Sequence, residues 1–152
     1  MFKKIFSVIA AMLLVVSCQG NNSSVDSGSW ADGQKADQYL AQGVESTVYF
    51  AFDSSALSEE TKGILNKQAN WWQASDKPTL VVEGHCDQRG TREYNLALGE
   101  RRANAVKNYL VSTGVPAAKV DVISYGKERP AVEGENEEAW AKNRRSVTVK
   151  SH

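Results

Sequence analysis

Cysteine, histidine, charge of one sign and long apolar runs are all scarce in this chain of 152 residues. It has two cysteines and two histidines, and its 18 basic side chains are balanced by 18 acidic ones. A disulfide scaffold is dense in cysteine, and nucleic-acid-binding domains usually show a basic surplus, so neither class is expected. The one long apolar run, residues 5–16, would rise about 18 Å as a helix, too short for a hydrocarbon core of roughly 30 Å.

Motifs of hydrolytic enzymes are missing as well. The sequence has neither a Gly-x-Ser-x-Gly elbow nor a His-Glu-x-x-His pair, and His152 is its last residue. A metal site at His85, Cys86 and Asp87 is disfavoured, because neighbouring strand residues point to opposite faces. His85 and Asp87 alone would supply fewer than the usual three or four ligands. We therefore expect no catalytic residue, no metal and no cofactor, with a hydrolase that uses paired carboxylates as the alternative.

The N-terminus has the pattern of an export signal. Lys3 and Lys4 precede the apolar run, and a small residue stands just before Cys18. Residues 1–17 are therefore predicted to be a signal peptide that is cleaved before Cys18. The alternative is an ordinary secretory signal with an incidental cysteine.

The four residues Val-Val-Ser-Cys that end at Cys18 resemble the lipobox of bacterial lipoproteins. The resemblance implies a lipidated Cys18, and anchoring by several acyl chains is firm because each buried methylene contributes about 0.8 kcal/mol. In such lipoproteins Asp after the cysteine favours inner-membrane retention, so Gln19 favours the outer membrane, with the domain facing the periplasm. Lipidation would leave Cys86 without a partner in the chain, as either a buried inert thiol or an exposed one open to a mixed disulfide.

The rest of the chain divides into a tether and one folded domain. Residues 18–46 are rich in Gly, Asn, Ser, Asp and Gln, and they predict a flexible tether with a short helix over residues 31–41. In the domain, residues 47–152, strands alternate with helices. The expected strands are residues 47–52, 79–85, 121–125 and 146–150, and the expected helices start at the N-cap Ser58, near residue 93 and at residue 135. This order predicts an α/β fold, a two-layer βαβαβαβ sandwich with a four-stranded mixed sheet covered by helices.

Arg102 is the first candidate for a functional side chain. On the helix expected over residues 93–112 it falls within the apolar stripe, about 40° from Leu98 at 100° per residue. A buried guanidinium needs partners, because removing a charge from water costs several kcal/mol. The alternative is an arginine whose stem packs while its head reaches water.

Two aspartates are candidate neighbours of Arg102. Asp53 follows the first expected strand and Asp87 follows the second, and ligands of α/β sheets bind beyond the carboxyl ends of parallel strands. Two carboxylates and one guanidinium suit a small zwitterion, because the acids can hold an ammonium while the guanidinium holds a carboxylate. Alternatively, Asp53 is a turn residue and Asp87 a structural salt-bridge partner.

Four separated motifs resemble one known family. They are Val48-Tyr-Phe-Ala-Phe-Asp53, Gly84-His-Cys-Asp87-Gln-Arg-Gly90 with the helix that follows to Arg102, Ser124-Tyr-Gly-Lys-Glu-Arg-Pro130, and Lys142-Asn-Arg-Arg145. In sequence and spacing they are similar to the OmpA-like peptidoglycan-binding domain, over residues 47–150. The resemblance implies a non-covalent grip on the peptidoglycan stem peptide at the free end of meso-diaminopimelate, which bears one ammonium and one carboxylate.

The resemblance also implies residue roles. Asp87 and Arg102 would provide most of the binding, and Asp53 would add a contact. Three further positions would line the pocket, namely Thr91, Asn95 and Leu98, although Asn95 could equally brace the helix. Cys86 and Arg92 depart from the Thr or Ala and the Pro that are usual there. We interpret Cys86 as a packing residue and expect Arg92 to loosen its loop slightly without removing a contact.

The resemblance places the chain in the cell envelope as a tether between outer membrane and wall. The implied partners are peptidoglycan, the outer membrane through the lipid anchor, and TolB with other Tol proteins, with a role in cell division; no nucleic acid is expected. The main alternative is an OmpA-like wall-anchoring lipoprotein of another envelope complex, and the other is a wall hydrolase. Replacing Asp87 or Arg102 by Ala is expected to abolish wall binding and leave the fold unchanged.

Overall fold

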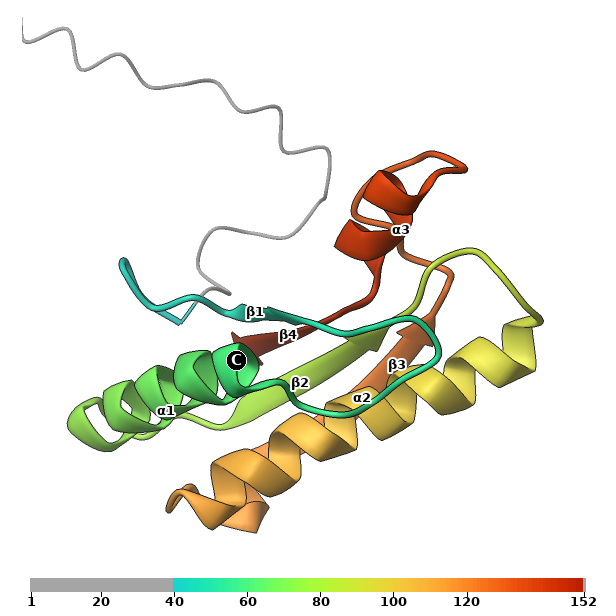
Figure 1. The fold of residues 1–152 in the computed structure, drawn as a ribbon. Coiled ribbons are helices and arrows are strands. Elements are labelled where there is room, and N and C mark those ends of the chain that lie inside the picture. The colour runs from blue at the N-terminus through green and yellow to red at the C-terminus, as the bar shows by residue number, and fades with distance from the viewer. Residues whose placement is uncertain (1–39, 152) are drawn as a thin grey trace, which may run out of the picture. The chain divides into compact units, whose positions relative to one another are not determined.

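The computed structural model describes residues 40–151, a four-stranded sheet with two long helices on one face (Figure 1). Its strands are β1 (Thr47–Tyr49), β2 (Leu80–His85), β3 (Val120–Gly126) and β4 (Arg145–Lys150). Its helices are α1 (Glu59–Ala74), α2 (Arg92–Ser112) and α3 (Glu137–Asn143), with a 3-10 turn, η2 (Ala117–Lys119), before β3. The strand order is β1-β4-β2-β3, in which β4 is antiparallel to both neighbours and β2 is parallel to β3. The predicted two-layer α/β fold with a mixed sheet is confirmed.

Each of the three helices begins at a side-chain cap. The side chains of Ser58, Thr91 and Asn136 accept hydrogen bonds from backbone N–H groups three residues on, at 3.1, 3.2 and 2.9 Å. Acidic residues occupy the first turn of every helix, where they complement the positive end of the helix dipole. The predicted cap at Ser58 is confirmed. Such a cap can be predicted because its two partners lie close together in the sequence.

The core lies between the sheet and the helices α1 and α2. Its fully buried side chains include Leu65, Leu80, Val82, Val106, Leu110 and Val120. Helix α2 comes especially close to β2 at Gly84 and Gly99, since a Cβ added to Gly84 would overlap the backbone of Gly99. This close contact fixes the N-terminal half of α2 against the end of β2, where the candidate site lies.

The packed domain extends further toward the N-terminus than the predicted boundary at residue 47. Leu40 is 2 % exposed and belongs to the core, with Val44 packed against it. The carbonyl of Glu45 accepts a hydrogen bond of 2.7 Å from Nε2 of Gln68 on α1. These apolar residues sit in a polar stretch whose average composition resembles a linker, so composition alone does not reveal their packing.

Several predictions fall on residues outside the described part of the chain. They are the signal peptide, the lipidated Cys18, the tether as far as residue 39, and all but the end of the helix expected over residues 31–41. Leu40 and Ala41, at that end, are not helical.

Strand β1 ends before the strand predicted over residues 47–52 does. After it the chain turns toward Arg102, whose guanidinium donates hydrogen bonds to the carbonyls of Ala51 and Ser54 at 3.1 and 2.8 Å. Asp53 lies between them with φ of 52°, a left-handed conformation that aspartate tolerates better than most residues. The resulting loop forms one wall of the candidate site.

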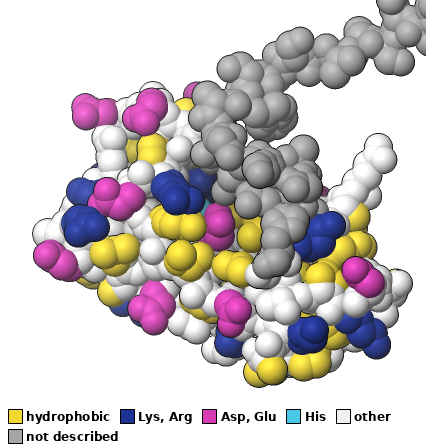
Figure 2. Space-filling model, turned by 180° about the vertical axis from the view of Figure 1, so that it is seen from behind, with side chains coloured by type: hydrophobic (Ala, Val, Ile, Leu, Met, Phe, Trp, Pro, Cys, Tyr) yellow, Lys and Arg dark blue, Asp and Glu magenta, His cyan; other side chains and the backbone are white. Residues whose placement is uncertain are grey.

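Charged side chains of both signs are interspersed on the part of the surface that Figure 2 leaves visible. This agrees with the balanced composition of the chain. Among residues 40–151, no helix combines the length and apolar character needed to cross a bilayer.

Candidate functional site

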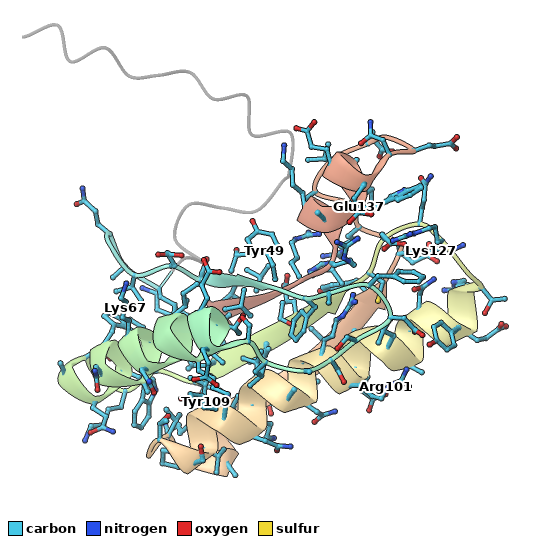
Figure 3. All side chains as sticks on the ribbon, in the orientation of Figure 1. Tyr49, Lys67, Arg101, Tyr109, Lys127 and Glu137 are labelled. Atoms are coloured by element: carbon cyan, nitrogen blue, oxygen red, sulfur yellow. The ribbon has the colours of Figure 1, made fainter. Side chains whose placement is uncertain are left out.

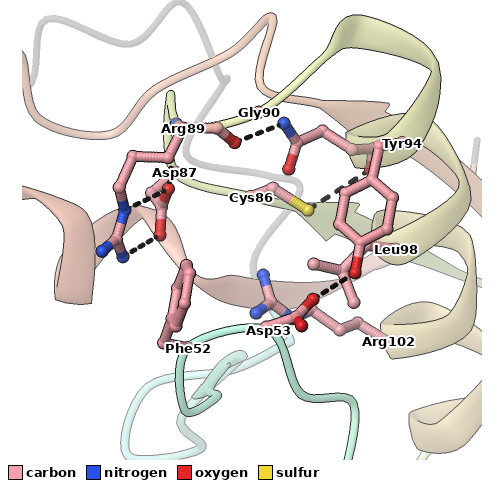
Figure 4. A pocket seen from close by; sticks show the side chains of 10 residues that line it. Phe52, Asp53, Cys86, Asp87, Arg89, Gly90, Tyr94, Leu98 and Arg102 are labelled. Atoms are coloured by element: carbon pink, nitrogen blue, oxygen red, sulfur yellow. Dashed lines mark hydrogen bonds and ion pairs between the residues drawn. The ribbon is translucent and has the colours of Figure 1, made fainter.

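A pocket of about 190 Å³ lies beyond the carboxyl ends of β1 and β2, beside the first half of α2 (Figure 4). Its lining residues are Phe52, Asp53, Cys86, Asp87, Arg89, Gly90, Tyr94, Asn95, Leu98 and Arg102. Strands β1 and β2 run in the same direction because each is antiparallel to β4 between them, so the loops after both strands meet at one edge. The volume equals about six water molecules at roughly 30 Å³ each, which suits the end of a molecule rather than a whole one.

Burial divides the lining into a floor and a rim. None of the floor residues is more than 5 % exposed; they are Cys86, Asp87, Asn95, Leu98 and Arg102. The rim is formed by Phe52, 60 % exposed, Tyr94, 46 % exposed, and the exposed Asp53. A ligand would therefore present its charged groups to the floor and its stem to aromatic rings.

Arg102 is buried, with 1 % of its surface exposed, so the alternative in which its head reaches water is wrong. Its Nε, Nη1 and Nη2 donate to the carbonyls of Ser54, His85 and Ala51 at 2.8, 2.9 and 3.1 Å. Burial lowers the pKa of Arg102, but a guanidinium keeps its charge in proteins. Three of its five N–H groups donate to carbonyls, and the other two are available to the neighbouring thiol of Cys86 or to a ligand carboxylate.

Asp87 is 5 % exposed and is held by Arg89. Its Oδ1 accepts from the backbone N and from Nε of Arg89 at 3.0 and 3.1 Å, and its Oδ2 accepts from Nη2 at 2.7 Å. Nη1 of Arg144 lies 3.7 Å from Oδ2. Burial acts to raise the pKa of Asp87, but the hydrogen bonds from Arg89 and the charges of Arg89 and Arg144 outweigh it and lower that pKa. Asp87 is thus an ionised carboxylate at neutral pH.

Arg89 is a pocket residue that the sequence did not reveal. Its guanidinium lies between the rings of Phe52 and Trp140, 4.1 Å from each ring centroid. Such stacking fixes the plane of the guanidinium and therefore the plane of the Asp87 carboxylate that it holds. The Asp-x-Arg spacing in a glycine-containing loop was the only available clue, because the two rings come from segments far apart in the chain.

Tyr94 is the second residue that was missed. Its hydroxyl donates to Oδ1 of Asp53 across the mouth of the pocket, and this hydrogen bond raises the pKa of Tyr94. Tyr94, Leu98 and Arg102 follow one another at four-residue spacing, so all three lie along one side of α2. The periodicity that singled out Arg102 could have found Tyr94 as well.

Of the three other predicted site residues, two line the pocket and one does not. Leu98 and Asn95 line the pocket, and Nδ2 of Asn95 also donates to the carbonyls of Arg89 and Thr91 at 2.8 and 3.0 Å. Thr91 caps α2 and does not line the pocket. The structure thus brings Asp53, Asp87, Asn95, Leu98 and Arg102 together and leaves Thr91 outside the pocket lining.

Cys86 is a free, buried cysteine on the pocket floor. Its Sγ donates to the carbonyl of Asn95 at 3.3 Å, and burial raises the pKa of the thiol. A neutral thiol is a poor nucleophile, which agrees with a packing role. Within the described residues, no cluster of three or more His, Cys, Asp or Glu side chains could hold a metal ion.

The chain matches the model of the OmpA family over residues 49–144. It is 42 % identical to the peptidoglycan-associated lipoprotein of Pseudomonas aeruginosa, with 95 % of this chain and 94 % of that protein covered. It is 40 % identical to the protein of the same name in Haemophilus influenzae, with 96 % of each covered.

Solved structures share the same fold. The crystal structure of the peptidoglycan-associated lipoprotein from Burkholderia pseudomallei is 38 % identical, with a TM-score of 0.68 over 70 % of this chain and 91 % of that one. The cell wall anchor of the T6SS from Pseudomonas aeruginosa is 26 % identical, with a TM-score of 0.59 over 70 % of this chain and 80 % of that one.

Proposed function

The chain belongs to the OmpA family and, within it, to the peptidoglycan-associated lipoproteins, and from that premise we propose that its pocket binds the diaminopimelate of the peptidoglycan stem peptide. One observation supports this above all: an ionised carboxylate, Asp87, and a buried guanidinium, Arg102, share the floor of one small pocket. The free end of diaminopimelate presents the complementary ammonium and carboxylate.

The proposed binding uses three floor residues, Asp87, Arg102 and Leu98, for separate groups of the ligand. The ammonium pairs with Asp87, and the carboxylate accepts from the terminal nitrogens of Arg102, both as charge-assisted hydrogen bonds. The aliphatic stem of diaminopimelate contacts Leu98 and the rings of Phe52 and Tyr94. Asp53, at the rim, adds a further contact to the ammonium.

Preorganisation favours this binding. Arg102 is already fixed by three backbone carbonyls, and Asp87 by the bidentate contact with Arg89, so the ligand does not have to order either side chain. A stem peptide with lysine in place of diaminopimelate lacks the carboxylate, and its binding would leave the buried guanidinium without a counter-charge.

We further propose that Cys18 carries the lipid anchor in the outer membrane and that the residues after it tether the domain, without catalysis, in the periplasm. The likeness to peptidoglycan-associated lipoproteins over 95 % of this chain supports this. Membership of the Tol system, with TolB as partner and a role in division, is proposed on that likeness alone. A second candidate is wall anchoring for another envelope complex, supported by the shared fold of a T6SS cell wall anchor.

Co-sedimentation with purified peptidoglycan tests the binding site. The full lipoprotein in detergent micelles is expected to sediment with the wall and to be released by free meso-diaminopimelate but not by lysine. Asp87→Asn should weaken binding at least tenfold, since a lost contact to a charged group is worth about 1.5–3 kcal/mol. Asp76→Asn is the matched control. Asp76 is exposed and precedes β2, so it lies at the other end of that strand from Asp87. Undiminished binding of Asp87→Asn would refute the proposal.

Co-purification from detergent-solubilised envelopes tests the partner separately. TolB is expected to copurify with the full lipoprotein. Recovery of components of a different envelope complex, without TolB, would favour the second candidate.

A further inference from the structure

The loop after β2 carries Asp87, and the backbone carbonyls of the next three residues all accept hydrogen bonds from side chains outside the loop. Nζ of Lys127 lies 3.3 Å from the carbonyl oxygen of Gln88 and 2.6 Å from that of Gly90. Nδ2 of Asn95 lies 2.8 Å from the carbonyl oxygen of the residue between them. These contacts tie three consecutive carbonyls of the loop to two side chains outside it, so the two side chains restrict its path.

Strand β3 ends at Gly126, beside the loop that follows β2, and this brings Lys127 within reach of the loop. Strand β3 is the parallel neighbour of β2, so the loops after both strands start at the same edge of the sheet. The carbonyl of Gly126 accepts from the backbone N of Cys86 at 2.8 Å. Gly126 has φ of 54°, and a Cβ there would lie 3.0 Å from the backbone N of Leu96. The residue before Lys127 is thus pressed against both the pocket loop and α2.

Glu128 makes a second contact from the same segment. Its Oε1 accepts from Nε of Arg92, the first residue of α2, at 2.9 Å. Arg92 therefore gains a contact that the expectation of a looser loop did not include. Both partners are well exposed, and such pairs add little. The contacts of Lys127 are also exposed, but one ammonium joins two carbonyls of the loop, so Lys127 is the stronger restraint.

We propose that Lys127 is a positioning residue for the ligand site: its ammonium holds the loop of residues 86–91 so that Asp87 and Arg89 are in place before the ligand arrives. This rests on the proposed function, since the ligand is taken to be the free end of diaminopimelate. Without Lys127 the carbonyls of Gln88 and Gly90 bond only to water. The loop then samples more conformations, and the ligand must restrict them on binding, which lowers affinity without removing any contact to the ligand.

Calorimetric titration of the full lipoprotein in micelles with a muropeptide that ends in diaminopimelate tests this role. Lys127→Met is expected to bind about tenfold more weakly, equivalent to 1.4 kcal/mol. Lys127→Arg should stay within about threefold of wild type, because a guanidinium can also donate to two carbonyls. The matched control is Lys67→Met on α1, at the other end of the molecule from Lys127 (Figure 3). Equal affinities of Lys127→Met and wild type, or equal losses in Lys127→Met and Lys127→Arg, would overturn the proposal.

A measurement on the ligand-free protein separates this role from the proposed function. The side-chain Nε–H of Arg89 donates to Asp87, so its proton should exchange slowly with water and give a sharp NMR signal. In Lys127→Met this signal is expected to broaden and exchange faster, whereas Lys67→Met should leave it unchanged. An unchanged signal in Lys127→Met overturns the positioning role whether or not the muropeptide binds. Wild-type protein that fails to bind the muropeptide would instead count against the proposed function.

Discussion

Replacing Arg102 by methionine is expected to destabilise the fold as well as the site. The substitution removes the hydrogen bonds to three backbone carbonyls, those of Ala51, Ser54 and His85, around a residue that is 1 % exposed. The carbonyl of His85 is buried there, and a buried carbonyl left unsatisfied costs about 1–3 kcal/mol; those of Ala51 and Ser54 are only partly buried, and the Ala51 carbonyl also accepts from the backbone N of Ser54 at 3.3 Å. Water entering from the pocket can satisfy part of this loss, so we expect a decrease of about 3–5 kcal/mol in the free energy of unfolding. That is a large share of the roughly 5–15 kcal/mol that a typical domain has.

The sequence alone predicts that loss of Arg102 leaves the fold unchanged, whereas its three carbonyl contacts predict a loss of stability. Urea unfolding followed by circular dichroism measures it, with Arg102→Lys as an intermediate case that keeps the charge but not the three-way geometry. Arg101→Met is the control, because Arg101 is exposed on the same helix and its described contact is a distant one with the Tyr94 ring, 5.8 Å from the centroid. It should change stability by less than about 0.5 kcal/mol. If Arg102→Met unfolds within about 1 kcal/mol of wild type, the three carbonyl contacts do not stabilise the fold as argued.

Four other outcomes are expected. Because Arg89 lowers the pKa of Asp87, wall binding should persist as the pH falls toward the ordinary aspartate range and be lost below it. In Arg89→Gln the loss of binding should occur at a higher pH, as measured by co-sedimentation from about pH 3 to 6. An unchanged pH profile in this variant would contradict the assignment. Trp140→Ala removes one ring from the Arg89 stack and should weaken wall binding severalfold, with an unaltered affinity excluding any role for the stack. Leu40→Ala should cost about 2–5 kcal/mol in urea unfolding, whereas no effect would restore the domain boundary at residue 47. Cys86 should react with a thiol reagent far more slowly in native protein than in urea, and rapid native labelling would show that it is accessible.

The parts of the fold that were predictable depend on local chemistry. Ser58 caps α1 by a contact with a residue three positions on, and a single sequence window contains both partners. The common edge for Asp53 and Asp87 follows from strand direction. It holds even though β4 lies between β1 and β2, because two antiparallel steps restore the original direction.

The parts that were not predictable depend on contacts between distant segments. Every residue has a backbone carbonyl, so no sequence pattern could show that Arg102 is held by carbonyls rather than by carboxylates. The stack around Arg89 needs Phe52 from the loop after β1 and Trp140 from α3. Leu40 was concealed because one apolar residue hardly changes the composition of a polar stretch.

The pairing of β1 with β4 has a mechanical consequence. Residues 40–46 belong to the packed domain and lead into the start of β1, and the pocket lies beyond the end of β1, so in the proposed tether a pull between anchor and wall would act roughly along this strand. The hydrogen bonds of an antiparallel ladder are perpendicular to its strands, and a pull along the strand loads all of them at once. The same force applied across the strand would open them one after another. If the proposed tether is correct, β1 is loaded in shear, the direction in which its pairing with β4 is strongest.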